Sequence, residues 1–226
     1  MSSAHRQYGH MRIIAGKWRS RRLAVPASER TRPMPDRIRE AVYDILGSRL
    51  GTPGALPAFA VADLFAGSGG MGLEALSRGA KTCDFVERRV SPLRVLRANL
   101  DRLDARGCSR VIHADAWTVA LSTPRPSGAY GLIVVDPPFV DARDTSASGK
   151  VVLLLSDLYR ALWADADTVI LLHHETQVAY QPGPRACWNV WNRRVYGRAA
   201  VTFIEQRTPD ENPHRATDKP KAPSVS

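Results

Sequence analysis

The segment Asp136-Pro137-Pro138-Phe139 directly follows an apolar run and has the residue types for chemistry at a planar amine. Proline has no N–H, so this turn would present a carboxylate and carbonyl oxygens without a donor at either proline. An amine conjugated to a purine is a poor nucleophile, and accepting its two N–H groups on Asp136 and on the Pro137 carbonyl would orient its lone pair. Phe139 would stack on the base. We therefore expect these four residues to be catalytic rather than only a rigid turn.

A glycine-rich turn, DLFAGSGGMG, covers residues 63–72 and carries the spacing G-x-G-x-x-G at Gly67, Gly69 and Gly72. Without a Cβ, glycine lets a ligand approach the backbone, although such a turn can also serve tight packing alone. Glu87 lies twenty positions after Gly67, where a carboxylate would accept both hydroxyls of a ribose. Turn and carboxylate together indicate a cofactor of the adenosine type.

Two such cofactors remain open at this point. A dinucleotide places its pyrophosphate on a helix N-terminus, whereas S-adenosylmethionine brings a cationic sulfonium and an amino-acid part, near which an acid such as Asp63 is useful. Asp115 would accept from an adenine amine or cap the turn that follows it. The chain has no G-x-x-x-x-G-K-[ST], which excludes a P-loop. The expected cofactor-binding residues are Asp63, Phe65, Ala66, Gly67, Ser68, Gly69, Glu87, Arg88, Asp115, Ala116 and Asp136.

Apolar segments typical of buried strands alternate with helical patterns and would position these residues. The strand segments are 58–65, 82–87, 110–115, 131–136 and 168–175. Their alternation predicts a parallel sheet covered by helices on both faces, because right-handed crossovers place helices there. Residues 187–206 read as two further strands joined at Tyr196-Gly197, which would give the sheet an antiparallel edge. Gly79 and Gly107 are expected to end helices, and Ser91-Pro92 to begin one.

The chain of 226 residues is strongly basic, with a formal net charge of +10, and the excess is uneven. Ten Lys or Arg against two acids give +8 over residues 1–39, which favours a polyanionic partner: nucleic acid first, an acidic membrane second. Cationic and apolar residues interleave around Trp18 as in an amphipathic hairpin that grips phosphates. The residues expected to bind nucleic acid, which would be RNA by the family resemblance given below, are Lys17, Trp18, Arg19, Arg21, Arg22, Arg32, Arg37 and Arg39.

Several classes of protein are excluded or disfavoured. The chain has neither a run of roughly 18 apolar residues nor a signal-peptide core, so we expect a cytoplasmic protein without membrane attachment. Cys83, Cys108 and Cys187 are scattered without a C-x-x-C spacing, so we expect no disulfide and no metal. The expected organisation is a disordered start (1–10), a basic extension (11–50), a catalytic domain (51–206) and a disordered tail (207–226). A monomer is the default.

The motifs, in their order over about residues 11–206, resemble the bacterial 16S rRNA guanine-N2 methyltransferase family (RsmD). The matching segments are MRIIAGKWRSRRL, RPMPDRIREAVYDIL, DLFAGSGGMGLEALSRGA, FVE, the acid at 115, DPPF and RRVYGRAAVTF. The resemblance implies an α/β, Rossmann-like class I methyltransferase fold with a mostly parallel seven-stranded sheet and a small basic N-terminal hairpin and helix. It also implies S-adenosylmethionine as donor and methylation of a guanine N2 in 16S rRNA. As partner we expect 16S rRNA within a small-subunit assembly intermediate, with naked rRNA as the open alternative.

The chain departs from the family pattern at two places. Phe139 stands where the family usually has Tyr, which removes a hydroxyl and keeps the stacking face. His173-His174-Glu175 replaces the usual acidic ending of that strand; a metal site there is disfavoured because adjacent strand residues point to opposite faces.

Three other functions stay open from the residues alone. A DNA adenine-N6 or protein glutamine methyltransferase would use the same acceptors for its amine. An NAD-dependent oxidoreductase would need the glycine turn and Glu87 but leave DPPF without a role. A non-catalytic RNA-binding module would explain only the basic arm.

Overall fold

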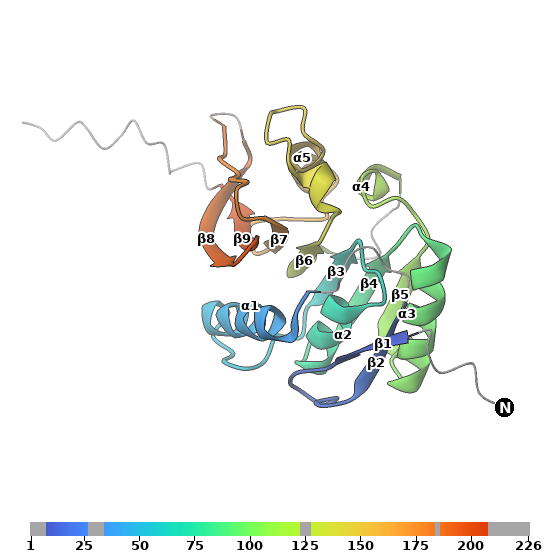
Figure 1. Ribbon diagram of the computed structural model, residues 1–226. Helices are drawn as coiled ribbons and strands as arrows, with labels where there is room; N and C mark the ends of the chain where they lie inside the picture. Colours follow the sequence, from blue (N-terminus) through green and yellow to red (C-terminus); the bar gives the residue numbers. More distant parts are fainter. Residues whose placement is uncertain (1–7, 27–33, 123–127, 184–185, 208–226) are drawn as a thin grey trace, which may run out of the picture.

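The structure is a computed structural model that describes residues 8–26, 34–122, 128–183 and 186–207. A seven-stranded sheet forms its centre (Figure 1). In spatial order its strands are β5 (Ser109–Ile112), β4 (Thr82–Val86), β3 (Ala60–Leu64), β6 (Leu132–Val135), β7 (Val169–Glu175), β9 (Ala199–Gln206) and β8 (Trp188–Tyr196).

The strand directions confirm the predicted mixed sheet. β5, β4, β3, β6 and β7 run parallel, whereas β9 pairs antiparallel with both β7 and β8. Gly197 makes the turn between β8 and β9 at a φ of +64°, in the left-handed region that glycine adopts without strain. The chain order reverses between β3 and β6, so the crevice at their carboxyl ends is the place where such sheets bind ligands.

Helices cover both faces of the sheet, as the alternation of strands and helices predicts. They are α1 (Asp36–Arg49), α2 (Gly70–Ser77), α3 (Val90–Arg102), α4 (Val119–Ser122) and α5 (Lys150–Arg160). Successive residues of β6 belong to different cores: Leu132 and Val134 pack with α1, α2 and α3, whereas Ile133 and Val135 pack with α4 and α5. Figure 1 shows α4 and α5 on the side of the sheet away from α1 and α2.

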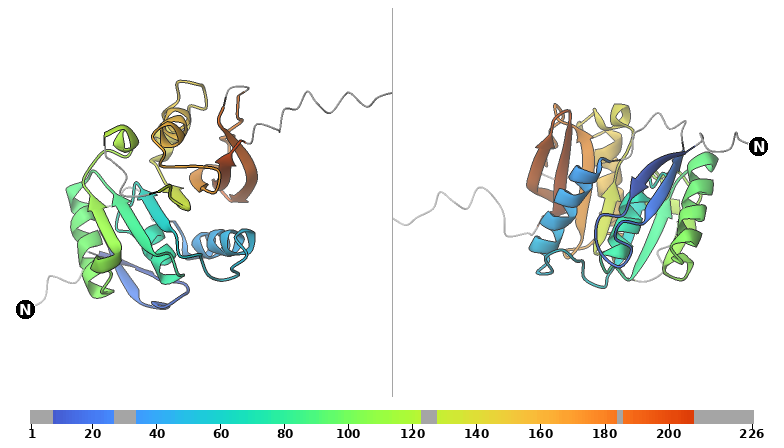
Figure 2. Two further views of the ribbon diagram at one scale, coloured as in Figure 1. Left: turned by 180° about the vertical axis from the view of Figure 1, so that it is seen from behind. Right: turned by 60° about the horizontal axis from the view of Figure 1, so that its bottom comes forward.

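The basic N-terminal segment forms an antiparallel hairpin of β1 (Tyr8–Arg12) and β2 (Arg22–Pro26). Its apolar side chains Met11, Ile13, Leu23 and Val25 are buried in the core that contains α1, α2 and α3. In Figure 2 the hairpin lies across α2 beside α3, and α1 lies across the other half of the same face. The hairpin is therefore part of the folded body.

Some predicted boundaries were wrong. Residues 8–10 belong to β1 instead of a disordered start, and Arg207 still bonds the Cys187 carbonyl, while residues 1–7 and 208–226 lie outside the described part. Helix α3 begins at Val90, before Ser91-Pro92, because Arg89 and not Ser91 has the extended backbone of its N-cap. Gly107 lies in a short 3-10 turn (Arg106–Cys108), and Asp104, with a φ of +52°, makes the left-handed turn after α3.

All three cysteines are free, and Cys83 is buried. Within the described ranges, no helix is long and apolar enough to cross a membrane.

Candidate active site

A pocket of about 520 Å³ lies at the carboxyl ends of β3, β4 and β6. All four residues of the DPPF segment line it, Asp136 among them, together with nine further expected cofactor-binding residues: Asp63, Phe65, Ala66, Gly67, Ser68, Glu87, Arg88, Asp115 and Ala116. Gly69 does not line the pocket; it is the N-cap of α2 at a φ of +91°. The sheet topology thus brings together acids that lie up to 73 positions apart, from Asp63 to Asp136.

The chain leaves β3 in a strained conformation at the pocket. Phe65 has a φ of +64°, in the left-handed region that bulky side chains rarely adopt. Its ring meets Trp117 edge to face, with centroids 4.7 Å apart. The two rings form one aromatic wall of the pocket.

The N–H groups of the three motif glycines are already bound to protein oxygens. Gly67 donates to Glu87 Oε2 at 3.0 Å, and Gly72 donates to Asp63 Oδ2 at 2.8 Å. Gly69 donates to the Ala66 carbonyl at 2.8 Å. The turn therefore does not direct these groups at a ligand in the pocket.

Three carboxylates converge on the pocket and make its interior acidic. Asp63 and Glu87 are only 2% and 5% exposed, and Asp136 follows the end of β6. Burial raises the pKa of Asp63 to about 7; the bond from Gly72 opposes this rise, and the charges of Asp136 and Glu87 add to it. A cation bound here would relieve this repulsion.

Two arginines and Asp115 lie at the rim of the pocket. Arg88 Nη1 lies 3.4 Å from Asp115 Oδ2, and Arg89 Nε lies 3.4 Å from Glu87 Oε1. Asp115 Oδ1 also accepts the N–H of Trp117 at 3.1 Å. Asp115 thus caps the turn after β5, and its side chain, 40% exposed, remains accessible to a ligand.

His173 is the hydrogen-bond partner of Asp136 and is not among the site residues predicted from the sequence. Its Nδ1 lies 2.7 Å from Asp136 Oδ1, and its ring meets Phe139 edge to face at 5.1 Å. The pairing register of β6 and β7 predicts this contact, because Leu172 pairs with Val135 and the next residues along the chain are His173 and Asp136. Met11, Met34 and Met71 also line the pocket and were not assigned; the sequence holds no separate signal for them beyond their apolar character.

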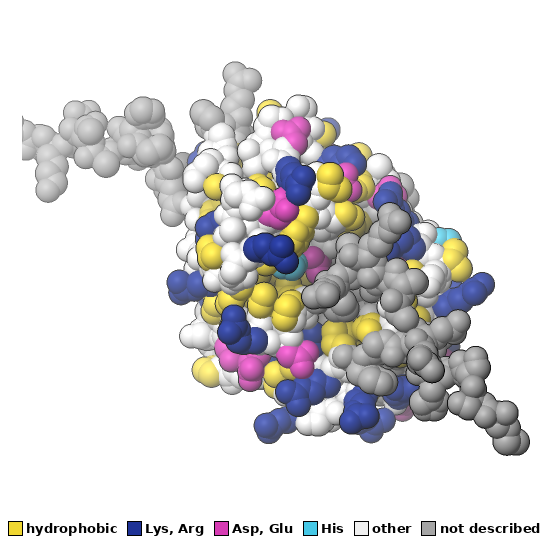
Figure 3. Space-filling view, in the orientation of Figure 1, with side chains coloured by type: hydrophobic (Ala, Val, Ile, Leu, Met, Phe, Trp, Pro, Cys, Tyr) yellow, Lys and Arg dark blue, Asp and Glu magenta, His cyan; other side chains and the backbone are white. Residues whose placement is uncertain are grey.

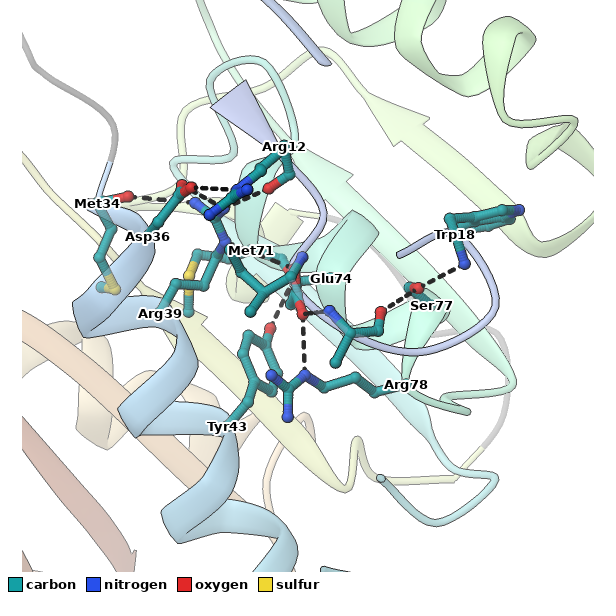
Figure 4. Close-up of polar contacts among 12 residues, drawn as sticks. Arg12, Trp18, Met34, Asp36, Arg39, Tyr43, Met71, Glu74, Ser77 and Arg78 are labelled. Atoms are coloured by element: carbon teal, nitrogen blue, oxygen red, sulfur yellow. Dashed lines mark hydrogen bonds and ion pairs between the residues drawn. The ribbon is translucent and has the colours of Figure 1, made fainter. Parts of the chain in front are cut away.

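Arg39 is buried, so its assignment to RNA was wrong, and it lines the pocket. It is 1% exposed, and its guanidinium donates to the carbonyls of Arg12 and Met34 and to Asp36 (Figure 4). Its Nε lies 3.6 Å from Glu74. The reason is that α1 packs over α2, which places this face of α1 inside the protein.

The cationic loop of the hairpin and the pocket lie at opposite ends of α2. Lys17 donates its N–H to the Ser77 carbonyl at 2.8 Å, and the Trp18 N–H donates to Ser77 Oγ at 3.0 Å. Ser77 is the last residue of α2, whereas Gly70 and Met71 at its start line the pocket. Eight helical residues span about 12 Å.

The other expected RNA-binding residues fall into three groups. Lys17, Arg19, Arg21 and Arg22 are exposed; Trp18 is half-buried under the Lys17 ammonium, which lies 4.3 Å from its ring centre. Arg37 is exposed on α1. Arg32 lies outside the described residues. Figure 3 shows Lys and Arg side chains around a middle area of hydrophobic, acidic and histidine side chains.

Among the described residues, no group of three His, Cys, Asp or Glu side chains has the arrangement of a metal site.

Comparisons with known proteins agree with this geometry. The family model described as "Conserved hypothetical protein 95" matches residues 11–205. The Ribosomal RNA small subunit methyltransferase D of Escherichia coli (strain K12) is 31% identical over 208 residues, which cover 92% of this chain and 96% of that protein. The protein of the same name from Haemophilus influenzae is 35% identical over 131 residues, 58% of this chain and 65% of that one.

A solved structure shares the whole fold. A hypothetical protein of Thermus thermophilus superposes with a TM-score of 0.66 at 30% identity, over 86% of this chain and 99% of that chain. The topology and the extent of these matches confirm the Rossmann-like methyltransferase fold. The chain is a methyltransferase and belongs to the family of the ribosomal RNA small subunit methyltransferases D.

Proposed function

We propose that the protein transfers a methyl group from S-adenosylmethionine to the exocyclic N2 amine of a guanine in 16S rRNA. The choice of cofactor rests on one observation: the N–H groups of the three motif glycines are bonded to protein oxygens and lie beside buried carboxylates. A dinucleotide needs free N–H groups for its diphosphate and would be repelled by these acids. A cofactor with a sulfonium and an ammonium group suits them.

The residues of the pocket fit S-adenosylmethionine part by part. Glu87 has one oxygen on Gly67 and one on Arg89, which leaves lone pairs for ribose hydroxyls. Asp63 would face the cationic amino-acid part, and Asp115 would accept from the adenine amine. When bound, the cofactor supplies an electron-poor methyl carbon for a nucleophile.

Asp136 and the prolines would prepare the nucleophile. Asp136 and the Pro137 carbonyl accept the two N–H groups of the guanine amine, and Phe139 stacks on the base, which has been extruded from the RNA. The N–C bond then forms as the C–S bond breaks, and the nitrogen loses one proton to Asp136 or to water. The described cysteines are absent from the pocket lining, so direct transfer to nitrogen fits better than a cysteine adduct.

The RNA would reach the pocket along α3. This helix starts at the pocket rim beside Arg89, and its last residue, Arg102, bonds the Arg22 carbonyl of the hairpin. Its thirteen residues span about 20 Å. Arg94 and Arg97 are exposed between the two ends. We propose that the hairpin loop grips phosphates distant from the target base, and that these arginines hold the strand between loop and pocket.

One assay tests the substrate. The protein is incubated with S-adenosylmethionine labelled on its methyl group and, in separate reactions, with naked rRNA, a small-subunit assembly intermediate, assembled small subunits, DNA and total protein. We expect label in the RNA, released by nuclease digestion as N2-methylguanosine, and stronger labelling of an assembly intermediate than of naked rRNA.

The other outcomes would each support a rival. Label on a DNA adenine or a protein glutamine would establish the alternative that the names of the relatives do not favour. RNA binding without any transfer would indicate a non-catalytic module. Reduction of NAD in place of transfer would indicate an oxidoreductase. We expect the active species to be a cytoplasmic monomer, which sedimentation of the methylating fraction would check.

A further inference from the structure

His173 joins the two ends of the catalytic segment. Its Nδ1 lies 2.7 Å from Asp136 Oδ1, and its ring lies 5.1 Å from that of Phe139 at an interplanar angle of 73°. Asp136 and Phe139 also line the pocket, as does His173. One imidazole ring thus contacts both the acid and the aromatic residue of the DPPF segment.

The hydrogen bond fixes how the two groups share a proton. An ionised carboxylate can only accept, so His173 Nδ1 carries the hydrogen and donates it to Asp136 Oδ1. His173 Nε2 is buried and has no hydrogen-bond partner among the described residues. Burying an unpaired polar nitrogen costs stability, so a purely structural role would be better served by an apolar side chain. The bond to Asp136 is what this histidine provides.

We propose that His173 is a positioning residue for methyl transfer: it holds Asp136 Oδ1 so that Oδ2 is left to accept the substrate amine. This inference rests on the proposed function. A carboxylate on a flexible χ2 torsion samples many orientations, and one fixed donor selects one of them. Asp136 is partly exposed, with 26% of its side chain accessible, so packing alone does not fix it.

The protonation of His173 also sets the charge beside the amine. Burial lowers the pKa of His173, but attraction and hydrogen bonding from Asp136 outweigh burial, and the pKa is raised. Below that pKa the pair is an imidazolium and a carboxylate with no net charge; above it, the pair carries −1. The negative pair accepts amine protons better and stabilises positive charge on nitrogen, so turnover should rise with pH.

Other charged groups lie near this pair, and the effect of their titration on turnover has to be distinguished from that of His173. They are Asp63 on β3, Arg143 after the Phe139–Ala142 turn, and His174 and Glu175 on β7. Glu175 is bound to Arg143 at 2.6 Å, which lowers the pKa of Glu175. Asp63 ionises near pH 7 without cofactor, so turnover is measured at saturating cofactor, where a bound cation keeps Asp63 ionised.

His174 is a matched control on the same strand. It donates from Nδ1 to the Glu175 carbonyl at 2.8 Å and accepts at Nε2 from Thr202 Oγ1 at 2.7 Å. Burial lowers its pKa to about 4, the Glu175 carbonyl opposes this, and Arg193 and His173 add to it. His174 therefore stays neutral at the pH values of the assay.

The test compares His173→Leu, His173→Asn and His174→Gln. We expect His173→Leu to lower kcat at least about tenfold because Asp136 loses its fixed orientation, with cofactor Kd unchanged. In His173→Asn the amide nitrogen replaces Nδ1 as donor, so kcat should return to within about threefold of wild type. Asn cannot titrate at this position, so the rise of kcat with pH that follows deprotonation of His173 should disappear. His174→Gln should keep the rise.

Two results would overturn the proposal: a kcat of His173→Leu equal to that of the wild type, or a rise of kcat with pH in His173→Asn that equals the wild-type rise. If His173→Leu does not fold, as judged by thermal unfolding and cofactor binding, the pH dependence of kcat in His173→Asn alone tests the proposal. Failure of the wild-type protein to methylate RNA would instead contradict the proposed function, so the two failures are distinguishable.

Discussion

Glu74 in α2 accepts the backbone N–H of Ile14 in the hairpin at 2.8 Å. Its other oxygen accepts the N–H of Ala15 at 3.0 Å and Arg78 Nε at 2.9 Å. Glu74 is fully buried, and Arg39 lies 3.6 Å from it (Figure 4). The helix that begins at the pocket therefore holds the cationic hairpin through this carboxylate, in addition to the bonds made by Ser77.

Replacing Glu74 with Gln should destabilise the whole protein. Gln keeps the size but removes the negative charge, which leaves the buried Arg39 and Arg78 without their shared counter-ion and gives Ile14 and Ala15 one acceptor fewer. We expect the free energy of unfolding to fall by about 3 kcal/mol, as measured by urea denaturation. Glu40→Gln, at an exposed position of α1, is the matched control and should change stability by less than about 0.5 kcal/mol. Equal free energies of unfolding for both variants would show that the contacts of the Glu74 carboxylate do not stabilise the protein.

The raised pKa of Asp63 predicts a pH-dependent cofactor affinity. A bound cation favours the ionised carboxylate, so below about pH 7 a proton must leave before binding. Affinity for S-adenosylmethionine should therefore fall by up to about tenfold per pH unit below that value and level off above it. Isothermal titration calorimetry between pH 5.5 and about 8.5 measures this, and Asp63→Asn should show a flat profile.

The raised pKa of Asp63 should also make the free energy of unfolding of the cofactor-free protein depend on pH. An unfolded Asp has a pKa of about 3.9, so between this value and about 7 the folded state binds more protons than the unfolded state. The free energy of unfolding should then fall as pH rises through this window, by at most about 1.4 kcal/mol per unit. Asp63→Asn lacks this slope. Parallel curves for both proteins would place the pKa of Asp63 at an ordinary value.

Much of the pocket was predictable because carboxyl ends of parallel strands meet at one edge. Asp63, Glu87, Asp115 and Asp136 each lie at or near the carboxyl end of an apolar strand segment, so the strand pattern alone places them together. His173 lies near the carboxyl end of β7, at the same edge of the sheet, but its approach to Asp136 depends on which strand neighbours residues 131–136. Applying the strand order to 131–136 and 168–175 would have set it beside Asp136.

The N-terminal segment was less predictable, because the charge of a side chain does not show whether the fold leaves it exposed or buries it. Arg37 and Arg39 look alike in sequence, yet Arg37 is exposed and Arg39 is 1% exposed. The difference depends on which face of α1 meets α2, and thus on the partners Glu74 and the Arg12 carbonyl. A count of positive charges cannot contain such tertiary information.

On the proposed mechanism, Asp136→Ala should abolish methyl transfer, because the acceptor for the substrate amine is lost, and should leave cofactor affinity within about threefold, because Asp63, Glu87 and Asp115 still line the cofactor side of the pocket. We expect kcat to fall at least about a hundredfold. Asp141→Ala is the matched control: Asp141 lies two residues after Phe139, outside the pocket lining, and pairs with Lys150. Single-turnover methylation with a fixed RNA measures both. Unchanged turnover in Asp136→Ala would remove the DPPF segment from the mechanism.

The proposed RNA path predicts two additive losses of binding. Neutralising the hairpin loop to Gln, at Lys17, Arg19, Arg21 and Arg22, should weaken RNA binding and lower the slope of log K against log salt by up to about 3. Neutralising Arg94 and Arg97 on α3 should lower that slope by a further 1 to about 1.5. Fluorescence anisotropy at several salt concentrations measures both slopes.

The control for this path is Arg160→Gln, on α5 at the opposite face of the sheet, where 78% of the side chain is exposed. It should leave the slope unchanged, since only phosphates within contact distance release counterions. Cofactor affinity should stay at the wild-type value in all three variants, because the loop lies at the far end of α2 from the pocket. If cofactor affinity collapsed in the loop variant, the loop would act by holding the hairpin on α2 rather than by gripping RNA. If the Arg94 and Arg97 variant bound RNA like wild type, the strand would take another route to the pocket.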